Sequence, residues 1–219
     1  MSSPTGTGAG RPAEPGAGSA ADAVLSERPL SGKTIGVLAL QGDVRSHSEV
    51  LQSLGASVRR VRTPEGLDGL DGLVLPGGES TTMTLGIERE QLGDPLRAAI
   101  SGGLPTLATC AGLILLDDDH LGVVDLHCER NAFGAQLHSF ESDLLVDGVD
   151  GGPVHAVFIR APRVTRHGDG VEVLATVPHE GVESGDGESV VAIRSGSVIG
   201  TSFHPEQAGE PRLHVLAFG

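Results

Sequence analysis

Aromatic residues are nearly missing from this chain of 219 residues, which has no Trp, no Tyr and five Phe. A hydrophobic core must therefore be built from Leu, Val, Ile and Ala. Basic residues are also scarce, since 15 Lys and Arg stand against 29 Asp and Glu, for a formal net charge of −14. A surface of that sign repels nucleic-acid phosphates and anionic membranes, so we exclude both as partners.

Three further absences bear on the compartment. The chain has two cysteines, Cys110 and Cys128, which are too few for a disulfide framework. No apolar run approaches the roughly 18 residues that span a membrane, and the N-terminus lacks the basic and apolar segments of a secretory signal. We therefore expect a cytoplasmic protein, because a reducing compartment preserves a working thiol.

Two regions of different composition divide the chain. Residues 1–32 are rich in Pro, Gly, Ala, Ser and Thr, which predicts a disordered tail. Residues 33–219 alternate continuous apolar runs with runs of helical spacing, which predicts one α/β domain with an open, mostly parallel sheet and helices on both faces. The strands expected in its first part are 34–40, 57–62, 72–75 and the run before Cys110, and the helices are 43–54 and 92–101.

Beyond Leu121 the pattern changes to short alternating strands separated by Gly and Asp. This texture predicts a small antiparallel section inserted before a final strand at 198–203. The expected strands of the section are 121–128, 140–146, 154–159, 171–177 and 189–194.

Cys110 lies between an apolar run typical of a buried strand and one typical of a helix. The next residues, Ala111 and Gly112, are small enough for a tight strand-to-helix turn. A cysteine on such a turn lies at the carboxyl edge of the sheet and at a helix N-terminus, where the helix dipole and free N–H groups favour the thiolate. The pattern therefore predicts a nucleophile.

The predicted final strand ends in His204, Pro205 and Glu206. Residues two apart in an extended segment point the same way, so Glu206 can orient the imidazole of His204. Either segment alone has a plain structural explanation, a buried cysteine or a polar turn. Together, at strand ends of one sheet, they predict a catalytic triad of Cys110, His204 and Glu206.

The loop after the strand at 72–75 contains Gly77 and Gly78. One interpretation is a tight turn before a helix, with Ser80 or Thr81 as its N-cap. The other is that the N–H groups of Gly78 and Ala111 form an oxyanion hole for the thiol chemistry. A phosphate-binding loop is disfavoured, because no Lys follows the glycines.

The remaining polar features have weaker patterns. Arg130 and Arg160 stand in otherwise apolar segments, where an arginine either pairs with an acid or binds a carboxylate ligand, and the residues alone leave both open. Cys128 has no base near it and is interpreted as a packing residue. The His residues show no metal-ligand spacing, and Asp117–His120 is interpreted as a solvated loop at a helix end rather than a metal site.

Six segments together resemble, in order, the glutaminase-subunit family of pyridoxal 5′-phosphate synthases, which belongs to the class I (triad) glutamine amidotransferases. The resemblance runs from about residue 34 to 207 of this sequence. The segments at 109–112 and 202–206 are common to the broad class, whereas those at 77–82, 129–134 and 158–162 are particular to the vitamin B6 branch. The sixth segment is 39–42.

The resemblance implies a class I glutaminase fold with a flavodoxin-like sheet, and hydrolysis of L-glutamine to glutamate and ammonia. It implies that Cys110 attacks the side-chain amide, His204 shuttles protons and Glu206 holds His204. The N–H groups of Gly78 and Ala111 would stabilise the oxyanion. The positions that match the glutamine-binding residues of the family are Gly78, Glu79, Ser80, Arg130, Ile159 and Arg160.

The resemblance also implies a partner. Ammonia would pass to a separate (β/α)₈ synthase subunit that makes pyridoxal 5′-phosphate, the two subunits forming a hetero-oligomer. The glutaminase itself would hold no cofactor and no metal.

The chain departs from the family at two places. The connection Asp117–His120 and the segment after Glu206, which contains Pro211, are both shorter than is usual. Three alternatives therefore stay open: a non-catalytic docking or regulatory subunit of the same synthase, a glutaminase serving another pathway such as histidine synthesis, and an unrelated Cys–His hydrolase.

Overall fold

The computed structural model describes residues 20–130, 140–178 and 187–219. The strands are β1 Thr34–Leu38, β2 Ser57–Val61, β3 Gly72–Leu75, β4 Thr106–Thr109, β5 Leu126–Glu129, β6 Phe140–Leu144, β7 Val154–Phe158, β8 Arg163–His167, β9 Glu172–Pro178, β10 Glu188–Ser195 and β11 Val198–Thr201. The helices are α1 Ala20–Glu27, α2 Val44–Ser53, α3 Ser80–Arg89, α4 Gly93–Ser101, α5 Ala111–Leu116 and α6 Arg212–Phe218, with a 3₁₀ turn at Pro64–Leu67.

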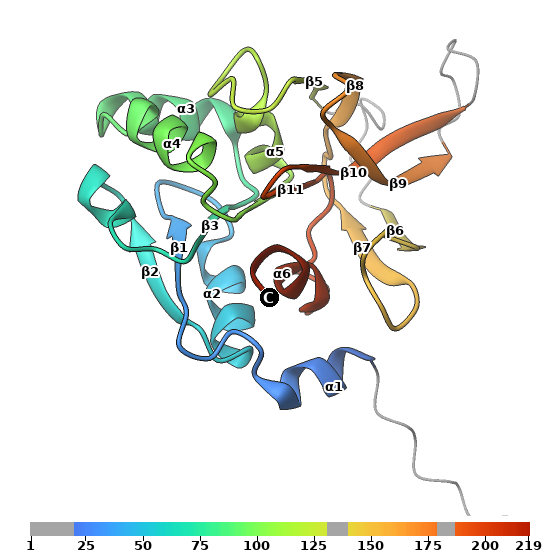
Figure 1. Cartoon of the computed structure of the whole chain (residues 1–219). Helices are drawn as coiled ribbons and strands as arrows, with labels where there is room; N and C mark the ends of the chain where they lie inside the picture. Colours follow the sequence, from blue (N-terminus) through green and yellow to red (C-terminus); the bar gives the residue numbers. More distant parts are fainter. Residues whose placement is uncertain (1–19, 131–139, 179–186) are drawn as a thin grey trace, which may run out of the picture.

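One sheet runs through the described part of the chain, with the strand order β2-β1-β3-β4-β11-β10-β8-β5 and β9 paired to β10 (Figure 1). Its first half is parallel, because β2, β1, β3, β4 and β11 pair in that sense. Every residue of β3, β4 and β11 is buried, which explains why these strands read as continuous apolar runs. The predicted fold class is confirmed.

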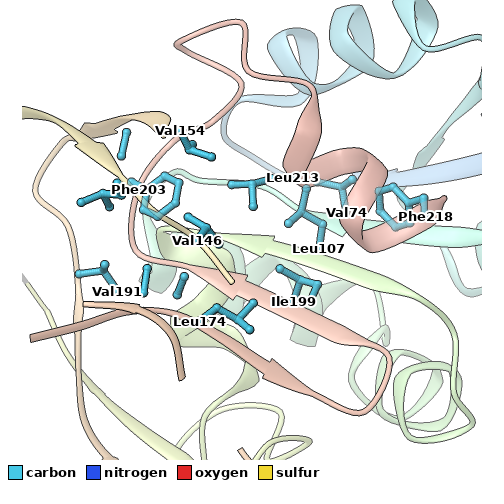
Figure 2. Close-up of a cluster of buried hydrophobic side chains, with 14 of the residues drawn as sticks. Val74, Leu107, Val146, Val154, Leu174, Val191, Ile199, Phe203, Leu213 and Phe218 are labelled. Carbon is cyan, nitrogen blue, oxygen red and sulfur yellow. The ribbon is translucent and has the colours of Figure 1, made fainter. Parts of the chain in front are cut away.

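Helices cover both faces of the parallel half, and each face has its own apolar core. Alternate side chains of a strand point to opposite faces, so Val74 of β3 belongs to one core while Leu73 belongs to the other. Figure 1 shows α3, α4 and α5 on one side of the sheet and α2 and α6 on the other. Figure 2 shows Val74 and Leu107 lying beside Leu213 and Phe218 of α6.

The second half of the sheet is antiparallel. Strand β10 pairs antiparallel with β11, β8 and β9, and β8 pairs with β5, while β6 and β7 form a separate hairpin. The inserted section was predicted, but strand β8 was not. The strand expected from residue 121 begins only at Leu126, because the preceding residues close the end of α5: Leu121 N–H donates to Leu115 O at 3.0 Å and Val123 N–H to Leu116 O at 3.1 Å.

The predicted boundary of the N-terminal tail was wrong at its C-terminal end. Residues 20–27 form α1, and Leu30 is 0% exposed, with its N–H donating to Leu54 O at 3.0 Å. A few apolar residues have little weight in a composition average, yet Leu30, with Val24 and Leu25, packs this segment against the core. The rest of the predicted tail, residues 1–19, lies outside the described residues.

Among the residues that the structure describes, no helix combines the length and apolar character needed to cross a membrane.

Candidate active site

Cys110 lies on the turn between β4 and α5, as the sequence predicted. Its backbone has φ 49° and ψ −106°, a conformation that non-glycine residues rarely adopt and that marks many functional sites. The turn is tight, because a Cβ added to Gly112 would overlap the carbonyl oxygen of Leu75. Cys110 N–H donates to Thr201 O at 2.8 Å, and the Cys110 side chain, which is 6% exposed in all, donates to Ile159 O at 3.8 Å.

His204 and Glu206 follow β11 at the same edge of the sheet. His204 Nδ1 lies 2.7 Å from Glu206 Oε1, and the two residues are 4% and 5% exposed. Burial lowers the pKa of His204, but side-chain hydrogen bonds to Asp43, Cys110 and Glu206 outweigh it and raise that pKa to about 12. The imidazole is therefore cationic at neutral pH, in contact with the cysteine side chain.

Asp43 is a neighbour of this pair that the sequence analysis missed. Its Oδ2 lies 3.4 Å from His204 Nδ1, so a second carboxylate faces the imidazole. A signal was available: Asp43 follows the first predicted strand, whose carboxyl end meets the same sheet edge as Cys110.

The loop at Gly77 and Gly78 lies against both Asp43 and His204. Gly77 O accepts from Asp43 N–H at 3.0 Å, so the Gly78 N–H of this trans peptide points the opposite way. A Cβ added to Gly77 would overlap the His204 ring, so no larger residue fits there. Gly78 and Ala111, the two predicted oxyanion donors, both line one cavity with Cys110.

That cavity encloses about 370 Å³, which is small for a ligand site and suits a single amino acid. It brings together all the predicted site residues except Glu206, which lies behind His204. The predicted lining residues are Gly78, Glu79, Ser80, Cys110, Ala111, Arg130, Ile159, Arg160 and His204. The lining residues that were not predicted as site residues are Gln41, Asp43, Ile114 and Gln207.

Glu79 has a role that the sequence analysis assigned to others. It is the N-cap of α3, so the prediction of Ser80 or Thr81 was wrong. Its carboxylate accepts from Thr82 N–H at 2.7 Å, Thr82 O–H at 2.8 Å and Thr81 N–H at 3.1 Å, because the glutamate side chain folds back over the helix start. The hydrogen bonds, with that to the Thr82 side chain foremost, lower the pKa of Glu79 to about 2.

The two predicted arginines line the cavity from different elements. Arg130 follows β5 and donates to Thr81 Oγ1 at 2.9 Å and to His120 Nε2 at 3.2 Å. Arg160 follows β7 and has φ 46°, which turns the chain sharply beside Ile159. These partners of Arg130 are a hydroxyl and an imidazole rather than a carboxylate. The rest of the motif at 129–134 lies outside the described residues.

Two buried histidines, His47 and His214, lie behind the His204–Glu206 pair, and the sequence analysis missed both. His47 Nε2 lies 3.4 Å from Glu206 Oε2 and 3.1 Å from Thr109 Oγ1, while His47 Nδ1 lies 2.9 Å from His214 Nε2. Burial lowers the pKa of His47 well below its usual value and that of His214 to about 4, so both are neutral. Thr109 also accepts from Gly77 N–H at 3.0 Å, which links this network to the glycine loop.

Among the described residues, two groups of side chains offer atoms close enough for a metal ion: Asp43 with His204 and Glu206, and Asp117 with Asp119 and His127. The first group is already paired internally. In the second, Asp117 accepts from Asp119 N–H at 3.1 Å, from His120 Nδ1 at 2.6 Å and from Cys128 N–H at 3.4 Å.

Asp117 is 1% exposed, so the prediction of a solvated loop was wrong for this residue. Cys128 is buried and packs in the core, as predicted. Burial, with the nearby Asp117 charge, raises the pKa of its thiol.

The fold and the site place the protein among the class I glutamine amidotransferases. A crystal structure described as a glutamine amidotransferase matches it with a TM-score of 0.74 and 44% sequence identity, over 84% of this chain and 98% of that one. The chain belongs to the SNO glutamine amidotransferase family, whose model matches residues 37–217.

Relatives from two bacteria carry a more particular name. The protein named pyridoxal 5′-phosphate synthase subunit PdxT in Rhodococcus opacus (strain B4) is 50% identical over 198 residues, which cover 86% of this chain and 95% of that relative. A protein of the same name in Parafrankia sp. (strain EAN1pec) is 52% identical over 196 residues, which cover 85% and 92%.

Proposed function

We propose that this protein is the glutaminase subunit of a pyridoxal 5′-phosphate synthase, and that Cys110 is its nucleophile. The observation that carries the proposal is the position of Cys110, which contacts the cationic His204 of the His204–Glu206 pair in a cavity of amino-acid size. Half of the residues are shared with relatives of that name over most of the chain.

The proposed reaction begins when the Cys110 sulfur, as thiolate, attacks the side-chain amide carbon of L-glutamine. The carbonyl oxygen becomes an oxyanion, which the N–H groups of Gly78 and Ala111 stabilise. His204 gives its proton to the leaving nitrogen, and ammonia departs. Water then adds to the thioester while His204 takes a proton from it, glutamate leaves and the Cys110 thiolate is restored.

Glu206 acts through His204. A buried carboxylate 2.7 Å from Nδ1 fixes the ring orientation, so that Nε2 faces the cysteine side and the imidazolium form is stabilised. Asp43, 3.4 Å from the same nitrogen, adds to this stabilisation.

We assign the substrate's α-carboxylate to the two arginines, because a guanidinium presents paired donors to a carboxylate. Both Arg130 and Arg160 line the cavity that contains Cys110. Ser80 and Ile159 also line the cavity, whereas the Glu79 carboxylate accepts hydrogen bonds from the first turn of α3.

The ammonia is passed to a (β/α)₈ synthase subunit in a cytoplasmic hetero-oligomer, where pyridoxal 5′-phosphate is made. The contacts among Cys110, His204 and Glu206 argue against the alternative of a non-catalytic docking subunit. The glutaminase of another pathway is disfavoured by the name that the relatives share.

The test is glutamate release from L-glutamine, with and without a (β/α)₈ pyridoxal phosphate synthase subunit, using Cys110→Ala as the blank and Cys128→Ala as the matched cysteine control. Release that rises with the synthase, survives Cys128→Ala and vanishes in the blank supports the proposal. No release from the folded protein in either condition favours the non-catalytic subunit.

A further inference from the structure

The short connection after α5 is rigidly built. It runs from Asp117 to His120, and its own backbone closes it: His120 N–H donates to Asp117 O at 3.1 Å, and Gly122 N–H donates to the same oxygen at 2.8 Å. Arg97 of α4 adds a side-chain bond to Leu121 O at 2.9 Å. His120 therefore lies on a turn that backbone and side-chain hydrogen bonds close.

Asp117 fixes the protonation pattern of the His120 ring. The two side chains meet at 2.6 Å, between His120 Nδ1 and Asp117 Oδ1. The carboxylate oxygens of Asp117 already accept from the backbone N–H groups of Asp119 and Cys128, so Nδ1 is the donor of this contact. With the ring proton on Nδ1, the other ring nitrogen, Nε2, can accept a hydrogen bond.

Arg130 uses that acceptor. Its Nη2 lies 3.2 Å from His120 Nε2, and a guanidinium has only donors, so the bond requires the tautomer that Asp117 selects. The other terminal nitrogen, Nη1, donates to Thr81 Oγ1 at 2.9 Å. Two supports from different elements thus hold the guanidinium at the wall of the cavity that contains Cys110.

We infer that His120 is a positioning residue, which holds Arg130 in the orientation that receives the α-carboxylate of an amino-acid substrate. The inference rests on the proposed function, in which Arg130 binds that carboxylate. A long arginine loses side-chain freedom when it binds, and a support that fixes it beforehand lowers that cost for substrate binding. The effect falls on binding rather than on the reacting groups, because His120 does not line the Cys110 cavity.

Two substitutions separate this role from a structural one. In His120→Asn, the amide nitrogen takes the place of Nδ1 and keeps the bond to Asp117, but nothing reaches Arg130. In His120→Gln, the amide oxygen reaches the place of Nε2 and accepts from Arg130. We expect the KM for glutamine to rise about tenfold in the Asn variant with kcat within about twofold, and to stay near the parent value in the Gln variant.

The matched control is His127→Gln, because His127 is a half-exposed histidine on the neighbouring β5 that pairs with Asp119. It is expected to leave both kinetic constants unchanged. All variants are assayed in complex with the synthase subunit. A rise in KM of equal size in the Asn and Gln variants, an unchanged KM in the Asn variant, or an Asn variant that fails to fold would each overturn the inference.

Arg130→Ala distinguishes failure of the inference from failure of the proposed function. A raised KM in Arg130→Ala, with no further rise when His120→Asn is added, is the expected result, because the two residues act through one contact. An unchanged KM in Arg130→Ala contradicts the carboxylate-binding role itself. A raised KM in Arg130→Ala beside an unaffected His120→Asn contradicts only the positioning role.

Discussion

The groups that we propose to react and those that we propose to receive the substrate's carboxylate are held in different ways. Cys110, His204 and Glu206 are buried at the ends of strands in the sheet centre, and His47 supports them from behind. The two arginines line the cavity from outside the sheet centre, and Arg130 contacts Thr81 of α3 and His120 of the short connection after α5. We therefore expect changes in the first group to act on kcat and stability, and changes in the second to act on KM.

The largest effect is expected for Cys110→Ala. Alanine fits the tight turn, so the fold and synthase binding should persist, while glutamate release falls by about 10⁴-fold or more because the nucleophile is gone. Steady-state release and co-elution with the synthase subunit are the two measurements. Loss of co-elution would show that the Cys110 side chain is needed to form the turn. The residue would then have a structural role as well as the proposed catalytic one.

Glu206→Gln should lower kcat by about 10²–10⁴-fold with little change in KM, because the amide no longer stabilises the imidazolium. The change also has a pH signature. The pKa of His204 is raised by folding, so its protonated form stabilises the fold fully below the unfolded value of about 6.5, and this contribution is lost as the pH rises towards about 12. Thermal melting from about pH 6 to 10 should show that the difference in melting temperature between parent and variant narrows at high pH. A difference that stays constant over this range would contradict the ion pair between His204 and Glu206.

Arg160→Ala should raise the KM for glutamine by about tenfold with kcat little changed, since a charge-assisted contact to the substrate is lost. Initial rates over a range of glutamine concentrations provide the test. Arg163→Ala is the matched control, because that arginine pairs with Glu129 at 2.6 Å and does not line the cavity. A fall in kcat with no change in KM would contradict the proposed role of Arg160 in substrate binding.

The smallest effect on activity is expected for Leu30→Ala. Truncation of a fully buried leucine costs about 2–5 kcal/mol of unfolding free energy. Leu30 is 0% exposed, and its backbone N–H donates to Leu54 O. Urea unfolding followed by circular dichroism measures the loss, and both kinetic constants should stay unchanged at temperatures where the variant is folded. A variant as stable as the parent would support the prediction that the tail extends to residue 32.

The strands of the parallel half could be read from the sequence because they are buried on both faces and carry unbroken apolar runs. The turn at Cys110 could be predicted because the two residues that follow it, Ala111 and Gly112, are small. His47 and His214 could not be found this way, because a buried histidine on a helix has no distinctive spacing and its partners come from distant segments. The N-cap of α3 was assigned to Ser80 or Thr81 instead of Glu79, because the direction of the Glu79 side chain depends on where the helix starts. Strand β8 was missed because most of its residues are polar and exposed.

The position of β11 sets the order in which the site can be completed during synthesis. This strand lies between β4 and β10 in the sheet, yet it is made of residues 198–201, and His204 and Glu206 follow it. While the chain leaves the ribosome, β4 and Cys110 emerge long before the strand that closes the sheet beside them. A nascent chain therefore carries the Cys110 thiol without His204, and the two side chains meet only when the central strand is inserted.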